Sequence, residues 1–573
     1  MKSLLCCSAA GLCCLTLLAG CQSRRPVESD DLTGSPSTSS ALPDDAASAD
    51  PLALTTEGRT NFRVVRPEDA SDAVISAAAA FYQSLCVFTP GDPDFTTDEQ
   101  LRNKVRDPDA VEILIDRTNY AESADFYATL AYDGYGFRVD GNKIVVGAWN
   151  TECLSRALNA LALRLRQNSS RDETDQPLLT VARDEVLDGH AGGVIAGLPH
   201  DDFPPSLVCD AGDQATLVVI GGADADHYQA YLDRLTAQGF TLYAQNAIAD
   251  NQFATFCTDD MTANVWYTAY SGEMRIVAEP RGSLPVCEED DGRAAECTPM
   301  MTLIGPEKVG MLILFRLSDG RFVVVDGGFG TDAGKLLYQT LQEQASDPER
   351  IVIAAWIFTH SHQDHIRAFQ QIAAGYLGNY NRTLTIEQVI CNFPGYDQAR
   401  VKTQVLGGTD DELRATLRNV FPETAVVKAH PGYRFRFADM TVEVLGTHES
   451  YLSTTYPELY NACCLFLRVS IAGQTIMLPA DSDATNNHVM AQMYGDYLKC
   501  DILQADHHGS FGGTVEINKL FAPAVVLYFT DENSFAKYVQ QDYNQWLINS
   551  PNFREAIVVG TKVTTLPLPY VGK

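Results

Sequence analysis

Four side chains that can bind metal ions follow the apolar run Ile351 to Phe358. His360, His362, Asp364 and His365 fall within six residues. The run is rich in Val, Ile, Trp and Phe, which predicts a buried strand with the cluster in the loop at its carboxyl end. A strand end fixes the backbone, and an irregular loop lets neighbouring side chains converge. Imidazole and carboxylate ligands suit zinc or another transition metal, and the absence of Cys argues against a thiolate site.

The spacing within this cluster favours two ions rather than one. His360 and His362 can point the same way and share one ion, while Asp364 and His365 can serve a second ion nearby. Eight of the eleven histidines lie between His360 and His508, where uniform scatter would place about three. The site is therefore expected in this part of the chain.

Two later strand ends add candidate ligands. A strand predicted over 442–445 leads to His448, which could complete the ligands of the first ion. A strand predicted over 474–478 runs into Asp481 and Asp483. A carboxylate at a strand end can bridge two cations and hold them about 3.5–4 Å apart. Asp481 and Asp483 are both candidates for this bridging role.

A third strand end delivers a histidine pair that opens into Gly-Ser. The strand predicted over 500–506 is followed by His507, His508, Gly509 and Ser510. Gly509 allows the backbone to approach a ligand closely. One imidazole can bind metal while the other contacts the substrate, and the residues alone leave open which of them does which.

The pattern His-x-His-x-Asp-His resembles the metal-binding signature of the metallo-β-lactamase superfamily. The order Asp326-Gly-Gly, the histidine cluster, Asn461 before an apolar strand, Asp481 and His-His-Gly-Ser extends this resemblance. It looks most like the extracellular hydrolase domain of DNA-uptake (competence) proteins, and it is similar to secreted phosphodiesterases such as cell-wall phosphorylcholine esterases. It covers residues 298–573 and implies an αββα sandwich there.

The resemblance also implies roles for single residues. Asp481 is favoured over Asp483 as the bridging ligand, and His508 is favoured as a ligand with His507 as a substrate or proton-transfer residue. For Asp326, support of the metal loop and a plain turn before Gly-Gly stay open. The implied catalytic residues are Asp364 and His507, and the implied ligands of two divalent ions, with zinc favoured over manganese, are His360, His362, Asp364, His365, His448, Asp481 and His508.

These features predict a metal-dependent hydrolase that uses a hydroxide held between two cations. The favoured substrates are phosphodiesters, either nucleic acid or a phosphorylated envelope polymer. A net charge of -32 argues against a basic surface that grips nucleic acid, which is therefore expected only as substrate. Hydrolysis of other esters, lactones or β-lactams is one alternative, because one fold hosts many chemistries. A surface binding lipoprotein without catalysis is the other.

The first 21 residues have the pattern of an export signal. Lys2 precedes an apolar run that ends in Leu-Ala-Gly-Cys21, which resembles a bacterial lipobox with Cys21 as the lipidated residue. An ordinary cleaved signal and a short membrane anchor are the alternatives. Residues 22–60 are rich in Ser, Thr, Asp, Pro and Ala and predict a disordered tether. The sequence thus predicts a protein anchored by lipid to the extracellular face of the bacterial membrane, with no protein partner evident.

Two small α/β modules are predicted before the hydrolase domain, over residues 61–185 and 205–282. Helices and strands alternate in both, and the first is similar in order to the accessory domain of some hexosaminidases. Neither contains a ligand-spaced histidine pair, and for the first module a structural role is favoured over a carbohydrate-facing one. Cys287 and Cys297 flank an acidic loop and could pair after export or stay free. His430 and His488 are expected to have no catalytic role.

Overall fold

The computed structural model describes residues 50–99, 107–286, 297–305, 307–375, 380–394, 410–450 and 460–573. Asp50–Lys573 forms one compact unit. The predicted signal peptide, most of the predicted tether and Cys287 lie outside the described residues, so the lipid anchor and the Cys287–Cys297 pairing stay predictions. Within the described ranges, no helix is both long enough and apolar enough to cross a membrane.

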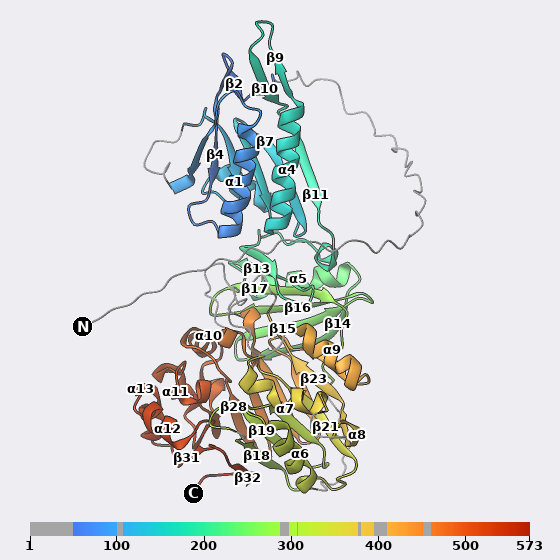
Figure 1. The fold of residues 1–573 in the computed structure, drawn as a ribbon, viewed down its shortest axis with the longest axis vertical. Helices are drawn as coiled ribbons and strands as arrows, with labels where there is room; N and C mark the ends of the chain where they lie inside the picture. Colours follow the sequence, from blue (N-terminus) through green and yellow to red (C-terminus); the bar gives the residue numbers. More distant parts are fainter. Residues whose placement is uncertain are drawn as a thin grey trace, which may run out of the picture. The chain divides into compact units, whose positions relative to one another are not determined.

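The first module is a six-stranded sheet with helices on both faces (Figure 1). Helices α1 and α4 pack on Val64 and Ile113, and α3 packs near Val65 and Leu114, because successive strand residues point to opposite faces. In sheet order the strands are β11 (Val186–His190), β7 (Gly134–Asp140), β8 (Lys143–Ala148), β6 (Val111–Ile115), β4 (Phe62–Arg66) and β5 (Asp94–Thr97), and the helices are α1 (Asp72–Cys86), α3 (Ala121–Thr129) and α4 (Thr151–Gln167).

Two small sheets of short strands lie beside this one. One has the order β1 (Leu52–Ala53), β10 (Pro177–Val181) and β9 (Ser169–Arg171), and the other pairs β2 (Thr55–Thr56) with β3 (Arg59–Thr60).

The second module is an antiparallel sheet that contributes to two hydrophobic cores. One face carries Val218 and Ile276 and packs against helix α5 (Ala225–Ala237). The other face carries Val219 and Trp266, which share a core with Phe466 of the hydrolase domain. The strand order is β12 (Leu207–Asp210), β13 (Thr216–Gly221), β17 (Glu273–Pro280), β16 (Met261–Thr268), β15 (Asn251–Cys257) and β14 (Thr241–Ile248).

The C-terminal domain, which the sequence predicts to be a hydrolase, contains two large sheets. The first has the order β24 (Ala425–Lys428), β23 (Gln388–Cys391), β21 (Ile351–Ile357), β20 (Phe322–Asp326), β19 (Leu312–Arg316), β18 (Met300–Ile304) and β32 (Val563–Pro567), with β22 (Leu384–Ile386) paired to β21. The second has the order β25 (Arg434–Phe437), β26 (Met440–Gly446), β27 (Phe466–Ile471), β28 (Gln474–Leu478), β29 (Ile502–Gln504), β30 (Val525–Tyr528) and β31 (Glu555–Val558).

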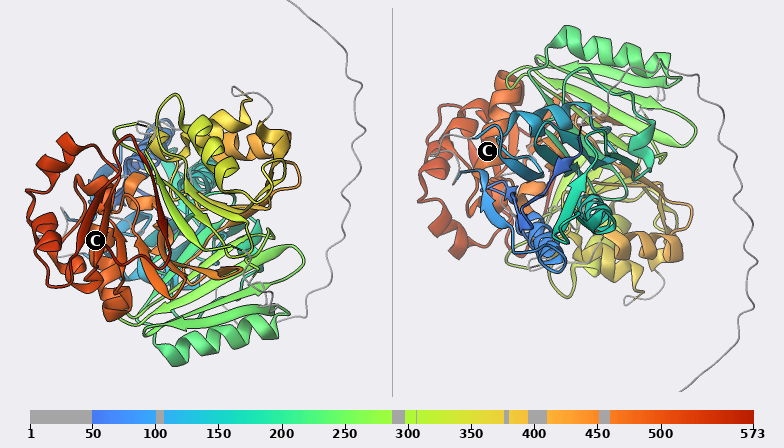
Figure 2. Two further views of the ribbon diagram at one scale, coloured as in Figure 1. Left: turned by 90° about the horizontal axis from the view of Figure 1, so that it is seen from below. Right: turned by 90° about the horizontal axis from the view of Figure 1, so that it is seen from above.

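Helices cover the outer faces of both sheets. The first sheet is covered by α6 (Ala333–Gln344), α7 (Gln363–Ala373), α8 (Tyr380–Thr383) and α9 (Asp410–Val420), and the second by α10 (Ala484–Tyr494), α11 (Val515–Phe521), α12 (Glu532–Tyr538) and α13 (Asp542–Ile548). The inner faces share one apolar core that includes Phe315, Val325 and Leu467. In the left view of Figure 2, the yellow and red helices lie on opposite sides of the strands. The predicted α/β class and αββα sandwich are confirmed.

The strand directions bring the candidate ligands to one edge of the sandwich. Strands β20 and β21 are parallel, so Asp326 and the histidine cluster follow them at the same edge. Strands β28 and β29 are also parallel and deliver Asp481 and the histidine pair. The amide of Leu465, just before β27, donates to the carbonyl oxygen of Thr359 at 2.9 Å. This bond ties the metal loop, residues 359–365, to the second sheet.

A buried network of charged groups links the second module to the hydrolase domain. His430 Nδ1 lies 2.8 Å from Glu449, and its Nε2 lies 3.0 Å from Glu279 on β17. Lys428 donates to the carbonyl oxygens of Ala211 and Gly212 at 3.0 Å. Burial alone would lower the pKa of His430, but the carboxylates of Glu449 and Glu279 outweigh it and raise this pKa to about 9. The imidazole is therefore charged at neutral pH and holds two carboxylates at the junction.

We expect this network to make stability depend on pH. The folded-state pKa of His430 is about 9, against a model value of 6.5. Its contribution is therefore fully present below pH 6.5 and is lost as pH rises through 9. The upper limit of this loss is about 3 kcal/mol. Chemical denaturation of wild type and His430→Gln from pH 6 to 9.5 measures this loss. The variant should have a lower free energy of unfolding than wild type at pH 6, and that free energy should fall less as the pH rises to 9.5. An equal decline in both proteins would contradict this role.

Candidate metal centre

Asp326 holds the metal loop from beneath. It ends β20 with φ +60°, a left-handed conformation that Asp tolerates better than most residues. Its buried carboxylate accepts from the backbone N–H of Thr359 at 2.8 Å, from the Thr359 hydroxyl at 2.8 Å and from His365 Nδ1 at 2.7 Å. Of the two readings of Asp326 left open by the sequence, the structure therefore shows support of the metal loop. The bond to Nδ1 directs the opposite nitrogen of His365, Nε2, into the site.

The strand-to-helix turn after β21 brings the histidines together. His362 is the residue before α7, so Asp364 and His365 stand in the first helical turn while His360 is still in the extended link. The Nε2 atom of His360 lies 3.1 Å from Nδ1 of His362. The two rings therefore converge from opposite sides of the turn.

Asp481, at the end of β28, lies among four imidazoles. Its Oδ2 atom is 3.3 Å from His365 Nε2, 3.7 Å from His360 Nε2 and 3.5 Å from His507 Nε2, and its Oδ1 atom is 3.6 Å from His508 Nε2. The side chain is 2% exposed. A single buried carboxylate thus touches both halves of the cluster, as a bridging ligand must.

The histidine pair after β29 has a strained backbone. His507 and His508 have φ of +45° and +60°, and such residues are held in place only by the surrounding structure. Gly509 follows at φ +89°, where a Cβ atom would lie 2.6 Å from the Tyr528 ring. This turn points His508 inward, where its Nε2 atom is 3.2 Å from Asp364 Oδ2. The surrounding structure therefore holds both histidines in a backbone conformation that is unfavourable for them.

His507 lies on the open side of the cluster. Its ring centroid is 3.9 Å from that of Phe511. The carboxamide nitrogen of Asn461 lies 3.3 Å from its Nδ1 atom, and burial lowers its pKa. His507 is therefore a neutral imidazole at pH 7 beside the metal ligands.

The donor atoms form two groups with the spacing that metal coordination requires. Within each group they lie within 4.8 Å of one another, and the groups are Asp364, His365, Asp481 and His508, and His360, His362 and Asp481. Ligands about 2.0–2.1 Å from a tetrahedral zinc ion lie roughly 3.4 Å apart, and the spacings above bracket this value. His365 Nε2 and Asp481 Oδ1 are buried without a hydrogen-bond partner within the described part of the chain. A metal ion would satisfy both atoms, so the residues fit a dinuclear site.

The charges of the cluster also suit metal binding, because ligands must be deprotonated. Burial alone would raise the pKa of Asp364 and of Asp481, but the surrounding histidines outweigh it and lower both. Burial lowers the pKa of His360 well below its usual range. Burial would also lower the pKa of His365, but Asp481 and Asp326 outweigh it and raise it.

Two sequence candidates lie elsewhere. His448 belongs to neither group of donors among the described residues. It is buried, and the charged side chains that act on its pKa are Glu449, Lys428 and His430. Asp483 caps α10 by accepting from the N–H groups of Thr485 and Asn486. The predicted ligand role of His448 stays a prediction, and Asp483 has a structural role.

Two exposed aromatic side chains beside the cluster were not singled out from the sequence. Phe511 is 56% exposed and Phe329 is 38% exposed. A Cβ atom on Gly310 would touch both the Asp364 carbonyl oxygen and Phe329, which places Phe329 next to the metal loop. The missed signal was a phenylalanine among glycines, in Gly-Gly-Phe-Gly and in Phe-Gly-Gly. A phenylalanine beside glycines has few large side chains next to it in the sequence with which to form a core.

Comparisons with known proteins find only distant similarities to solved structures. No protein-family model and no curated protein sequence matches the chain. Among solved structures, the metallo-β-lactamase fold protein YhfI from Bacillus subtilis is 15% identical, with 47% of this chain and 100% of that chain covered and a TM-score of 0.29. CmlA, a diiron β-hydroxylase from Streptomyces venezuelae, is 14% identical, with 47% of this chain and 54% of that chain covered and a TM-score of 0.31. A diphosphatase of the PhnP family is 11% identical, with 48% of this chain and 100% of that chain covered and a TM-score of 0.28.

Similarities of this size say nothing about activity. The C-terminal domain is an αββα sandwich, and it carries a candidate metal-binding cluster at the edge where its strands end. Any statement about the reaction must rest on that cluster.

Proposed function

We propose that this protein is a metal-dependent hydrolase acting on phosphodiesters at the cell surface. The observation that carries the proposal is Asp481, which is shared by two groups of buried metal-competent side chains. Two divalent cations bound there would supply Lewis acidity and a water molecule of low pKa. Zinc is favoured because the donors are imidazole and carboxylate, and manganese is the second choice.

The chain's own residues have distinct roles in this proposal. His360, His362, His365 and His508 hold the cations, and Asp326 fixes the orientation of His365. Asp364 is a ligand whose carboxylate also accepts a proton from the attacking water. His507 lies outside both ligand groups, next to Asp481 and to the exposed Phe511, and in this proposal its neutral imidazole contacts the substrate and donates an N–H hydrogen bond to the departing oxygen. The proton that Asp364 accepts from the water passes to that oxygen. No serine or cysteine nucleophile is required.

The surroundings of the cluster favour a substrate of low charge. The chain has 74 acidic residues against 42 Lys and Arg, which disfavours long polyanions such as DNA through their repulsion. Phe511 and Phe329 offer apolar surface on the rim of the site. We therefore favour an envelope-derived or small phosphodiester with an apolar or aromatic substituent over nucleic acid. Carboxylic esters, lactones and β-lactams form the second candidate class, since the apolar rim suits them equally.

The lipid anchor at Cys21 would hold the enzyme on the extracellular face of the bacterial membrane. This part of the proposal rests on the Leu-Ala-Gly-Cys motif. Metabolic labelling with a clickable fatty acid tests it, with Cys21→Ser as the control that should not be labelled.

Hydrolysis of bis(p-nitrophenyl) phosphate tests the activity. The purified full chain, loaded with Zn²⁺ or Mn²⁺, should release p-nitrophenol, and the double variant His362→Ala, Asp364→Ala should not. Chelation should abolish turnover, and adding metal back should restore it. Two bound ions without phosphodiester turnover would favour carboxylic esters and lactams as the substrates. If the protein neither binds metal nor hydrolyses the phosphodiester, a binding protein would be favoured.

Phe511→Ser tests the apolar rim. We expect KM for bis(p-nitrophenyl) phosphate to rise several-fold with kcat nearly unchanged, since a lost stacking contact is worth roughly 1 kcal/mol. Methyl p-nitrophenyl phosphate, which lacks the second ring, should show little change. Phe203→Ser, at an exposed phenylalanine just before the second module (41% exposed), is the matched control. Equal effects on both substrates would show that Phe511 does not contact the substituent.

A further inference from the structure

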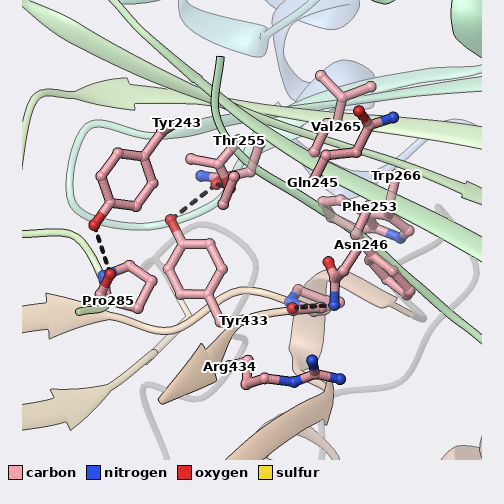
Figure 3. A pocket seen from close by; sticks show the side chains of 15 residues that line it. Tyr243, Gln245, Asn246, Phe253, Thr255, Val265, Trp266, Pro285, Tyr433 and Arg434 are labelled. Carbon is pink, nitrogen blue, oxygen red and sulfur yellow. Dashed lines mark hydrogen bonds between the residues drawn. The ribbon is translucent and has the colours of Figure 1, made fainter. Parts of the chain in front are cut away.

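A cavity of about 300 Å³ shares no residue with the metal cluster. Strands β14, β15 and β16 of the second module form one wall, and the segment Pro431–Arg434 that leads into β25 forms the other. Figure 3 shows the rings of Tyr243 and Tyr433 entering it from these two walls. Small-molecule pockets occur preferentially at such domain junctions, and this volume is at the lower end of their range. It suits a single ring rather than a polymer.

The walls are held in place by bonds between the two domains. The Tyr433 hydroxyl donates to Asn264 Oδ1 at 2.9 Å, and the Asn246 carboxamide donates to the Gly432 carbonyl oxygen at 3.1 Å. Gly432 has φ +87°, and a Cβ atom there would lie 2.3 Å from the Phe253 side chain. The backbone therefore rests directly on an aromatic ring. The cavity is a preformed feature of the junction.

The lining contains no carboxylate, although the chain is strongly acidic. None of its fifteen residues is Asp or Glu, against 74 in the sequence. The one charged side chain, Arg434, is bound to Glu443 at 2.6 Å. A cationic ligand would find no partner here, and an anionic one would compete with Glu443 for Arg434. The ligand that fits is uncharged.

The remaining side chains suit a ring with one apolar and one polar aspect. Four of the lining residues are aromatic (Tyr243, Phe253, Trp266 and Tyr433), and Gln245 and Asn246 add carboxamides that can both donate and accept hydrogen bonds. A pyranose ring presents C–H faces to aromatic rings and hydroxyls to carboxamides. We propose that this cavity binds a neutral monosaccharide unit, which would give the protein a glycan-binding site independent of the metal centre.

Ligand-observed saturation-transfer NMR on the purified full chain tests this site. The neutral probes are methyl β-D-glucoside, methyl β-D-galactoside and N-acetylglucosamine, and the charged comparisons are glucosamine and glucuronate. We expect at least one neutral sugar to give saturable binding that exceeds that of both charged sugars. Tyr243→Ala removes one ring at a 44% exposed position and should raise the Kd at least tenfold.

Tyr270→Ala is the matched control, because Tyr270 is also exposed (48%) and does not line the cavity. It should bind as wild type does. The proposal is overturned if no neutral sugar binds at tens of millimolar, if charged sugars bind equally well, or if Tyr243→Ala keeps the wild-type Kd. Because the measurement does not involve hydrolysis, its result is independent of the activity proposed for the metal centre.

Discussion

Asp481→Asn should lose both metal ions and nearly all hydrolytic activity while the fold is kept. The substitution is isosteric, but the amide carries no charge and offers one acceptor oxygen in place of two. Asp481 belongs to both donor groups, so a single change weakens both ions at once. Replacing a residue that only orients a ligand typically costs 10–100-fold in metal affinity or activity. Loss of a shared ligand should therefore exceed about 100-fold.

Asp483→Asn is the matched control for this prediction. Asp483 lies two residues further on and caps α10 through its side chain. Asn caps a helix about as well as Asp does, so metal content and activity should be unchanged. Metal analysis by mass spectrometry, together with kcat/KM, measures both variants. Retention of two ions by Asp481→Asn would show that this carboxylate does not bridge them.

The second large effect is expected at Asp326, where two substitutions separate stability from metal binding. Asp326→Ala leaves the Thr359 amide and the His365 imidazole without their acceptor in a fully buried place. Breaking a buried charged pair in this way costs about 3–5 kcal/mol. The left-handed φ of +60° adds strain for alanine. The free energy of unfolding should fall accordingly.

Asp326→Asn should instead lower metal affinity with a smaller loss of stability. With its oxygen toward the Thr359 amide, the asparagine NH₂ group faces His365 Nδ1, which must then accept a hydrogen bond. The proton of His365 would move to Nε2, the atom that faces Asp364 and Asp481. We expect a loss of 10–100-fold in metal affinity, measured by competition with a chelator. An unchanged metal affinity would show that Asp326 does not set the tautomer of His365. The control is Asp332→Asn, at an exposed helix start without a side-chain cap bond.

The sequence predicts well which candidate side chains lie close together, wherever they follow parallel strands. His360, Asp364, Asp481 and His508 converge because β20 with β21 and β28 with β29 end at the same edge of the sandwich, as the alternation of apolar runs and polar loops indicates. Local signals also place the helices closely. Helix α5 begins at Ala225, for example, because the Asp224 side chain caps it by accepting from the N–H of His227.

Contacts between distant segments could not be read from the sequence. His448 follows a strand as Asp481 does, but it belongs to neither donor group among the described residues, and the charged side chains that act on its pKa are Glu449, Lys428 and His430. Nor could the pairing of β18 with β32, more than 250 residues later in the chain, be read from the sequence. The shared core between the second module and the hydrolase domain also depends on tertiary packing. The cavity at this junction therefore has no sequence signature.

Anomalous diffraction at the zinc edge, from crystals of the zinc-loaded protein, tests the central claim most directly. We predict two peaks about 3.5–4 Å apart, one bounded by His360, His362 and Asp481 and the other by Asp364, His365, Asp481 and His508. A peak beside His448 would add it to the first set. Crystals without a peak at Asp481, or with zinc only at other sites, would contradict a dinuclear centre and the hydrolase proposed from it.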